Sequence, residues 1–169
     1  MDIFGEDNCV EPVDLTDVRS FCSMSSTDQS EDHLLSILIS SARAQLEQWV
    51  PFWIAERSVI LHGMAEPCIK LKGPIIAVSE VMLKTGKDSD EDGGWTDISE
   101  QCSLDGEVLT LPDWADGPLQ VEIVTGSYCP KPIQTALLMM VRNAYSDRTA
   151  DPLTDEVRAL ASPFMTVKS

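Results

Sequence analysis

Residues 117–148 read GPLQVEIVTGSYCPKPIQTALLMMVRNAYSDR, and this stretch decides the fold. Apolar and polar residues alternate over positions 119–123, which is the period of two that is typical of a half-buried strand. After a turn, Pro132 suits the first position of a helix, because its missing N–H would have no partner there. The remainder predicts a helix with one wide apolar stripe. The stripe consists of Ile133, Ala136, Leu137, Met140, Val141, Ala144 and Tyr145.

The sequence before this stretch predicts two further helices and a set of strands. Helical spacing of apolar residues extends over residues 14–50, where Asp14 is a suitable N-cap and Pro51 ends the pattern. The period changes to that of strands over residues 57–125. Within that region, Asp105-Gly106 between two apolar runs is a strong hairpin signal. Helical spacing then returns over residues 131–162.

The order of these elements predicts an α+β fold. We expect a small bundle of about four helices, interrupted by a β-rich insertion of about five or six antiparallel strands. Residues 1–13 are acidic and lack apolar periodicity, which predicts a flexible arm. Residues 14–162 are predicted to form a single composite domain, and residues 163–169 a C-terminal tail.

The charge of the chain is strongly negative and unevenly distributed. Its 169 residues contain 28 Asp and Glu against 12 Lys and Arg, so the net charge is −16. Sequence-independent DNA binding needs clustered Lys and Arg, and this composition argues against it. The stretch 131–148 differs from the rest, since it carries three basic residues and one acidic residue.

Several observations predict a cytosolic setting. Residues 1–7 lack the basic start and the apolar run of a signal peptide. The longest apolar run, residues 136–141, is too short for a membrane span. The five cysteines are widely spread without a CxxC pair, which is typical of reduced thiols.

The chain resembles the head–tail connector (adaptor, or head-completion) proteins of tailed bacteriophages, in the long form with a β insertion. The resemblance is carried by four segments in order. The last one is the most specific, because it combines a strand, a glycine, prolines and a helix that ends in Tyr145-Ser146-Asp147-Arg148. The segments are VDLTDV at residues 13–18, EDHLL with ISSAR at residues 31–43, IKLKGPI at residues 69–75, and residues 121–148.

The resemblance implies a structural virion protein without enzymatic activity or cofactor. Proteins of this family form a ring, usually of twelve subunits, beneath the portal protein. The ring extends the DNA channel and provides the attachment platform for the next connector or the tail. The implied partners are other copies of the chain, the portal protein and a downstream head-completion or tail protein. Genomic DNA would pass through the channel without sequence-specific binding. The implied location is the neck of the virion, and the host cytoplasm during assembly.

No motif in the sequence predicts catalysis. The loop at residues 88–93 matches the first half of a calcium loop, with Asp88, Asp90 and Asp92 as candidate ligands. The second half fails, because position 12 of the loop falls on a serine, so a solvated hairpin tip is the favoured interpretation. His33 and His62 have no Cys or Asp partner at ligand spacing, which predicts no metal site for either.

Two groups of residues are candidate contact sites. Lys131, Arg142 and Arg148 form a basic cluster on the last long helix, and aromatic residues at a helix end add Trp49 and Trp53. We expect these five residues to contribute to a subunit interface. The apolar residues of the tail are candidates for docking on the portal, by analogy with connector proteins. They are Phe164, Met165 and Val167.

Two rival functions remain open at the level of sequence. The net charge of −16 also permits an acidic DNA mimic that inhibits a host nucleic-acid-binding protein. The acidic residues are not arranged in regular helical rows, which argues against that function. A metal-dependent binding module would rest on the loop at residues 88–92 alone.

Overall fold

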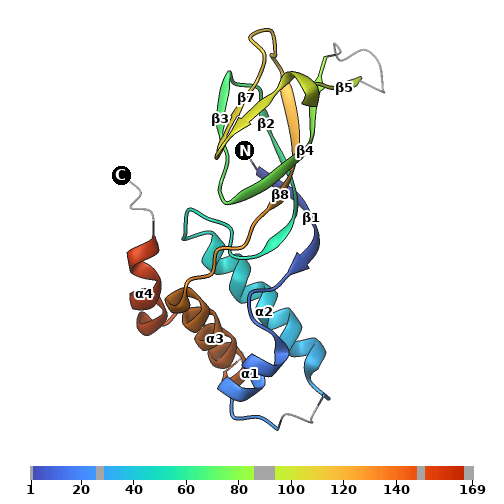
Figure 1. Ribbon diagram of the computed structural model, residues 1–169. Helices are drawn as coiled ribbons and strands as arrows, with labels where there is room; N and C mark the ends of the chain where they lie inside the picture. Colours follow the sequence, from blue (N-terminus) through green and yellow to red (C-terminus); the bar gives the residue numbers. More distant parts are fainter. Residues whose placement is uncertain (1, 26–28, 86–93, 148–150, 166–169) are drawn as a thin grey trace. The chain divides into compact units, whose positions relative to one another are not determined.

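The computed structural model has the α+β fold that the sequence predicts, with four α-helices and eight strands in the part of the chain that it describes (Figure 1). The residues described are 2–25, 29–85, 94–147 and 151–165. The predicted acidic loop at residues 88–92 lies outside them, as do Arg148 and Val167.

The chain groups into two compact units, where we expected one composite domain. The strand unit comprises residues 1–10 and 56–126, and the helix unit comprises residues 11–55 and 127–169. The chain therefore passes from one unit to the other three times. The alternation of apolar residues shows which segments are strands, but it does not show that these strands pair mainly with one another.

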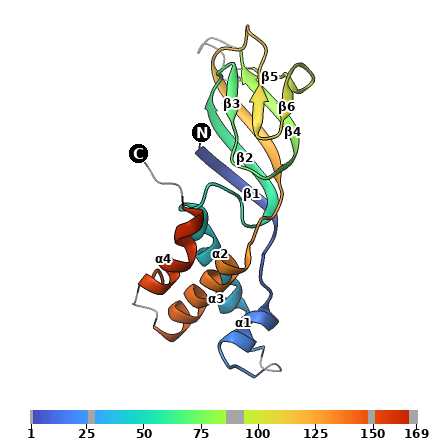
Figure 2. The same cartoon turned by 60° about the vertical axis from the view of Figure 1, so that its left-hand side comes forward.

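The strand unit contains two antiparallel sheets (Figure 2). The larger sheet has the order β1-β2-β8-β4-β5, and the smaller has the order β3-β7-β6. A short 3-10 turn, η1, spans Ser99–Gln101. The strands are β1 Asp2–Val10, β2 Glu56–Met64, β3 Cys68–Lys70, β4 Ile75–Lys84, β5 Trp95–Asp97, β6 Ser103–Asp105, β7 Val108–Thr110 and β8 Pro118–Thr125. The described strands thus exceed the five or six that we expected, because three-residue strands have too few positions to show a period.

The expected flexible arm is instead a strand. Strand β1 pairs antiparallel with β2 over most of its length, from Asp2 opposite His62 to Val10 opposite Glu56 (Figure 2). Its register shifts twice along the strand. An edge strand is held by backbone hydrogen bonds to its neighbour, so it needs no alternating apolar pattern of its own. Because the arm is acidic and lacks an apolar pattern, its sequence did not indicate a strand.

Strand β8 lies at the centre of the larger sheet, between β2 and β4. Its residues Leu119, Val121 and Ile123 are buried, as the alternation predicts. Val121 lies opposite Leu61 on β2 and Val81 on β4, and both of these are buried too. The core of the strand unit is thus built on the strand with which the fold-determining stretch begins.

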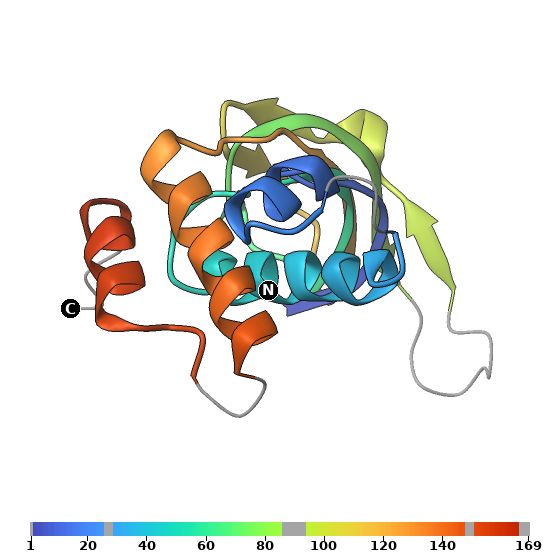
Figure 3. The same cartoon turned by 90° about the horizontal axis from the view of Figure 1, so that it is seen from below.

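The helix unit contains four α-helices at the predicted places. They are α1 Leu15–Phe21, α2 Asp32–Glu47, α3 Lys131–Ser146 and α4 Asp155–Ala161, followed by the 3-10 turn η2 Ser162–Phe164. Helix α3 contacts each of the other three, with α4 on the far side of it from α1 and α2 (Figure 3). None of the helices in the described parts combines the length and the apolar character that crossing a membrane requires.

The predicted apolar stripe of α3 forms the centre of the helical core. Five of its seven members are buried, and they are Ile133, Ala136, Leu137, Met140 and Val141. Asp14 caps α1 as expected, because its Oδ1 accepts a hydrogen bond from the backbone N–H of Asp17 at 2.7 Å. The Tyr145 hydroxyl donates to Glu31 and so links the end of α3 to the start of α2.

Candidate interface surfaces

Helix α3 carries two exposed cations on one side. Lys131 and Arg142 are eleven residues apart, which is about three helical turns, so both project from the same face. The exposed Thr135 lies between them on that face. We call Lys131, Thr135 and Arg142 the basic stripe; the third predicted cation, Arg148, lies outside the described residues.

Neither cation of the basic stripe forms an ion pair with a carboxylate in the described residues. The Lys131 ammonium donates to the Gln134 side-chain oxygen at 3.3 Å. The Arg142 guanidinium lies over the ring of Phe21, 5.2 Å from its centroid. Lys131 also occupies the first turn of α3, where the helix dipole disfavours a positive charge. Lys131 therefore does not stabilise the helix at this position, and its presence there needs another explanation.

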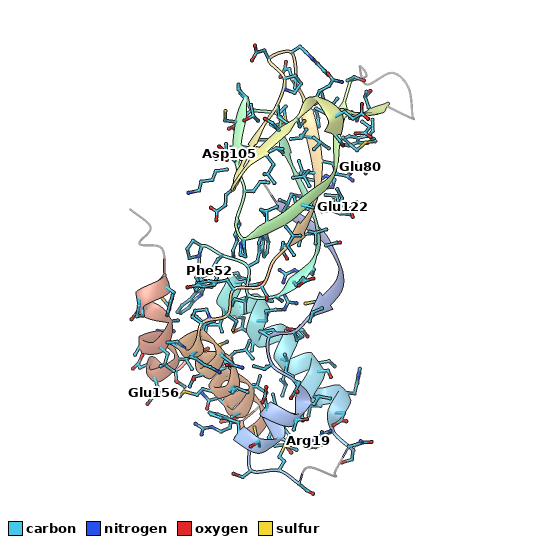
Figure 4. All side chains as sticks on the ribbon, in the orientation of Figure 1. Arg19, Phe52, Glu80, Asp105, Glu122 and Glu156 are labelled. Carbon is cyan, nitrogen blue, oxygen red and sulfur yellow. The ribbon has the colours of Figure 1, made fainter. Side chains whose placement is uncertain are left out.

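A groove lies between α1 and α2 in the helix unit. Its volume is about 570 Å³. Arg19 lies on its wall (Figure 4). This residue forms an ion pair with Asp32 and is almost fully buried. We call this the α1–α2 groove. It is lined by Glu11, Val13, Asp14, Leu15, Thr16, Arg19, Gln29, Asp32, Ser36 and Ile39, so three carboxylates face one cation.

A buried ion-pair network links α2 to the segments that precede and follow it in the sequence. The Arg43 Nη1 donates to Glu47 at 3.0 Å, and its Nε donates to Glu11 at the same distance. Glu47 also accepts a hydrogen bond from the backbone N–H of Ile54 at 2.8 Å. Arg43 and Glu47 are 4% and 6% exposed. The network therefore positions residue 11, where the chain enters the helix unit, and residues 54–55, where it leaves.

The two predicted tryptophans differ in their surroundings. Trp53 is only 2% exposed, so we correct its expected place in a subunit interface. Its position just after a helix gave no indication of this burial. Trp49 is half-buried, and the Arg158 guanidinium lies 5.5 Å from the centroid of one of its rings. Trp49 therefore remains a candidate.

The start of the predicted docking tail packs within the helix unit. Phe164 packs edge-on against Phe52, with ring centroids 6.3 Å apart. The ring centroid of Phe52 lies 4.9 Å from that of Tyr128, and Tyr128 is 50% exposed. Met165 is half-buried against the same helical core. Phe164 and Met165 thus use part of their surface within their own unit, and Val167 lies outside the described residues.

The strand unit carries an unusual pair of carboxylates. Glu80 on β4 and Glu122 on β8 lie directly opposite each other (Figure 4). Both project from the face opposite the buried Val121, because successive side chains alternate along a strand. Like charges in directly opposite positions destabilise a sheet. The pair therefore needs an explanation other than the stability of the fold.

The two histidines lie in different units of the chain. His33 is exposed in the first turn of α2, and the ring of His62 on β2 lies 6.5 Å from that of Trp95. No group of three potential metal ligands occurs in the described parts of the chain. The candidate ligands Asp88, Asp90 and Asp92 lie outside those parts, so that prediction stays untested.

Cys129, just before α3, is expected to be the slowest of the cysteines to react. Burial raises the pKa of its thiol to about 11, against a smaller lowering by Lys131. At pH 8 only about 0.1% is then thiolate, the reactive form, and the fraction rises about 100-fold by pH 10. Cys68, on β3, is exposed. Iodoacetamide labelling followed by peptide mass spectrometry should find Cys68 modified first at pH 8. Equal rates for both cysteines would contradict this prediction.

Comparison with known proteins shows the fold. No protein-family model matches the chain, and no curated protein matches it. A chain in the neck of an empty gene transfer agent particle, computed with C6 symmetry, superposes with a TM-score of 0.73 at 18% identity. A chain in the virion of the native particle gives 0.71 at 18%, and one in the native neck with C12 symmetry gives 0.68 at 19%. Each match covers 100% of this chain and 97% of the other.

Proposed function

We propose that this protein is a structural subunit of the head–tail neck of a tailed phage or phage-like particle. It forms an adaptor ring beneath the portal, extends the DNA channel and provides the platform for the next connector or the tail. The likeness to gene transfer agent neck chains carries the proposal, because it extends over both units and almost the whole of the other chain. The role is one of assembly and not of catalysis.

The charge of the protein supports a channel that does not retain DNA. With a net charge of −16, the protein repels a polyanion over distances of about one Debye length, roughly 8 Å at physiological ionic strength. The opposed Glu80 and Glu122 fit this role, since their cost to the sheet is explained if an acidic surface is needed. Genomic DNA would then pass without sequence-specific binding.

A ring requires two different patches on each subunit that meet head to tail. We propose that the basic stripe on α3, with Arg148 and Trp49, belongs to one such patch. The tail beyond residue 165, including Val167, is proposed to contact the portal, while Phe164 and Met165 anchor it on the helix unit. The opposite end of the ring would receive the downstream head-completion or tail protein.

Native mass spectrometry of the purified protein, alone and mixed with the cognate portal ring, tests this function. We expect about twelve copies to add to one portal, even if the free protein is a monomer, because ring closure on a template costs less association entropy per subunit. A monomer that ignores the portal would overturn the proposal. Tight binding to a basic host protein would then favour the acidic DNA mimic.

A further inference from the structure

We propose that the basic stripe of one copy docks in the α1–α2 groove of the next copy. This inference rests on the proposed ring function and deepens it, because it names the two patches that meet. The occupant of the groove would be the exposed face of α3 with Lys131, Thr135 and Arg142. Three observations support the pairing: charge, position and an unsatisfied donor.

The charges of the two surfaces are complementary. Glu11, Asp14 and Asp32 line the groove; Arg19 is the one cation among its lining residues, and Arg43, which is not among them, pairs with Glu11. The stripe presents two cations that have no carboxylate partner in the described residues. In a chain with a net charge of −16, most surfaces repel their copies. A contact between copies therefore has to use one of the few basic surfaces.

The two surfaces lie on opposite sides of α1. Residues Leu15, Thr16 and Arg19 line the groove, whereas Phe21 lies under Arg142 of the stripe. At about 100° of rotation per residue, Phe21 is roughly 190° from the mean direction of the other three. Surfaces on opposite sides cannot meet within one molecule. They are placed for a head-to-tail contact between copies, which is the type that closes a ring.

Arg19, which lines the groove, also has a donor that the described residues leave without a partner. The Nε of Arg19 is buried and has no hydrogen-bond partner, although its Nη2 pairs with Asp32. Buried polar groups in folded proteins are almost always hydrogen-bonded, so such a donor points to an acceptor from outside. The hydroxyl oxygen of Thr135 lies between the two cations of the stripe and is a suitable acceptor.

The test uses two charge variants that should not assemble alone. The acidic-stripe variant carries Lys131→Glu and Arg142→Glu, so both of its surfaces are negative. The basic-groove variant carries Thr16→Lys, Gln29→Lys and Ser36→Lys, so both of its surfaces are positive. All five positions are exposed, and circular dichroism will check that each variant folds. In a one-to-one mixture, every contact between unlike variants is again attractive.

We expect each variant alone to lose at least about 10-fold in ring yield on the portal, and the mixture to regain it with the two variants in equal numbers. Native mass spectrometry reads both the yield and the composition. A matched control places the same three positive charges elsewhere, as Gln101→Lys, Ser103→Lys and Ser127→Lys, at positions that are also exposed. This control keeps both native surfaces, so it should form rings of its own copies and should not take up the acidic-stripe variant in equal numbers.

Three results would overturn the inference. They are a normal ring from either variant alone, a mixture that stays unassembled, and rings in which the control and the acidic-stripe variant occur in equal numbers. If the unmodified protein forms no ring on the portal, the proposed function itself fails. The test therefore separates a wrong pairing of surfaces from a wrong function.

Discussion

Replacing Glu47 with Ala is expected to lower the free energy of unfolding by about 3 kcal/mol. The carboxylate of Glu47 is 6% exposed and bonds both Arg43 and the backbone N–H of Ile54. Its removal takes one counter-charge from a buried guanidinium and leaves a buried backbone donor without this acceptor. Breaking a buried pair by deleting one partner costs more than the pair contributes, because the remaining charge stays desolvated.

Urea denaturation followed by circular dichroism will measure the loss. Glu47→Gln keeps an oxygen for the Ile54 N–H but removes the charge, so we expect an intermediate loss of about 1–2 kcal/mol. Glu100→Ala is the matched control, since Glu100 is exposed in η1, and it should change stability by less than about 0.5 kcal/mol. If Glu47→Ala costs no more than Glu100→Ala, the network does not stabilise the helix unit.

Replacing Val121 with Asp is expected to cost at least about 4 kcal/mol. Val121 is fully buried on β8, between Leu61 and Val81 of the neighbouring strands. A carboxylate there would lose its hydration with no cation or hydrogen-bond donor nearby among the apolar neighbours. The expected result is a strand unit that does not fold at room temperature, seen as loss of the strand signal in circular dichroism.

The same change at an exposed position separates burial from strand propensity. Val108 on β7 is 38% exposed, so Val108→Asp should cost less than about 1 kcal/mol, the span of intrinsic strand preference. Thermal melting of the two variants under identical conditions compares them directly. Equal melting temperatures would mean that β8 is not the centre of the core.

Elements with a long, regular period could be predicted from sequence, and their pairing could not. The stripe of α3 is a local property of residues 133–145, and burial of five of its seven members confirms it. The hairpin was predicted with Asp105-Gly106 as its turn, which is one residue too early in the sequence. Asp105 pairs with Val108, so that Gly106 and Glu107 form the loop, and Gly106 has a φ of +60°. Strand β1 was missed because its pairing depends on the open edge of β2, which is 46 to 60 residues away in the sequence.

The candidate surfaces divide in the same way. Lys131 and Arg142 could be found because both lie on one helix, where spacing alone determines a shared face. The α1–α2 groove was missed because it brings together segments from residues 11–19 and 29–39, and only packing places them side by side. The excess of acidic residues over positions 1–32 was a signal for it, although we interpreted part of it as a flexible arm.

The three passages of the chain between the units have a mechanical consequence. They leave the strand unit from neighbouring strands at one end of the sheet, since Val10 lies opposite Glu56, and Arg57 lies opposite Thr125. A tensile load between the units would thus be shared by three covalent connections, and β1, β2 and β8 would be pulled in the same direction without sliding past one another. Proteolysis at any one passage would leave two connections intact. A subunit of this design tolerates a break that would separate domains joined by a single linker.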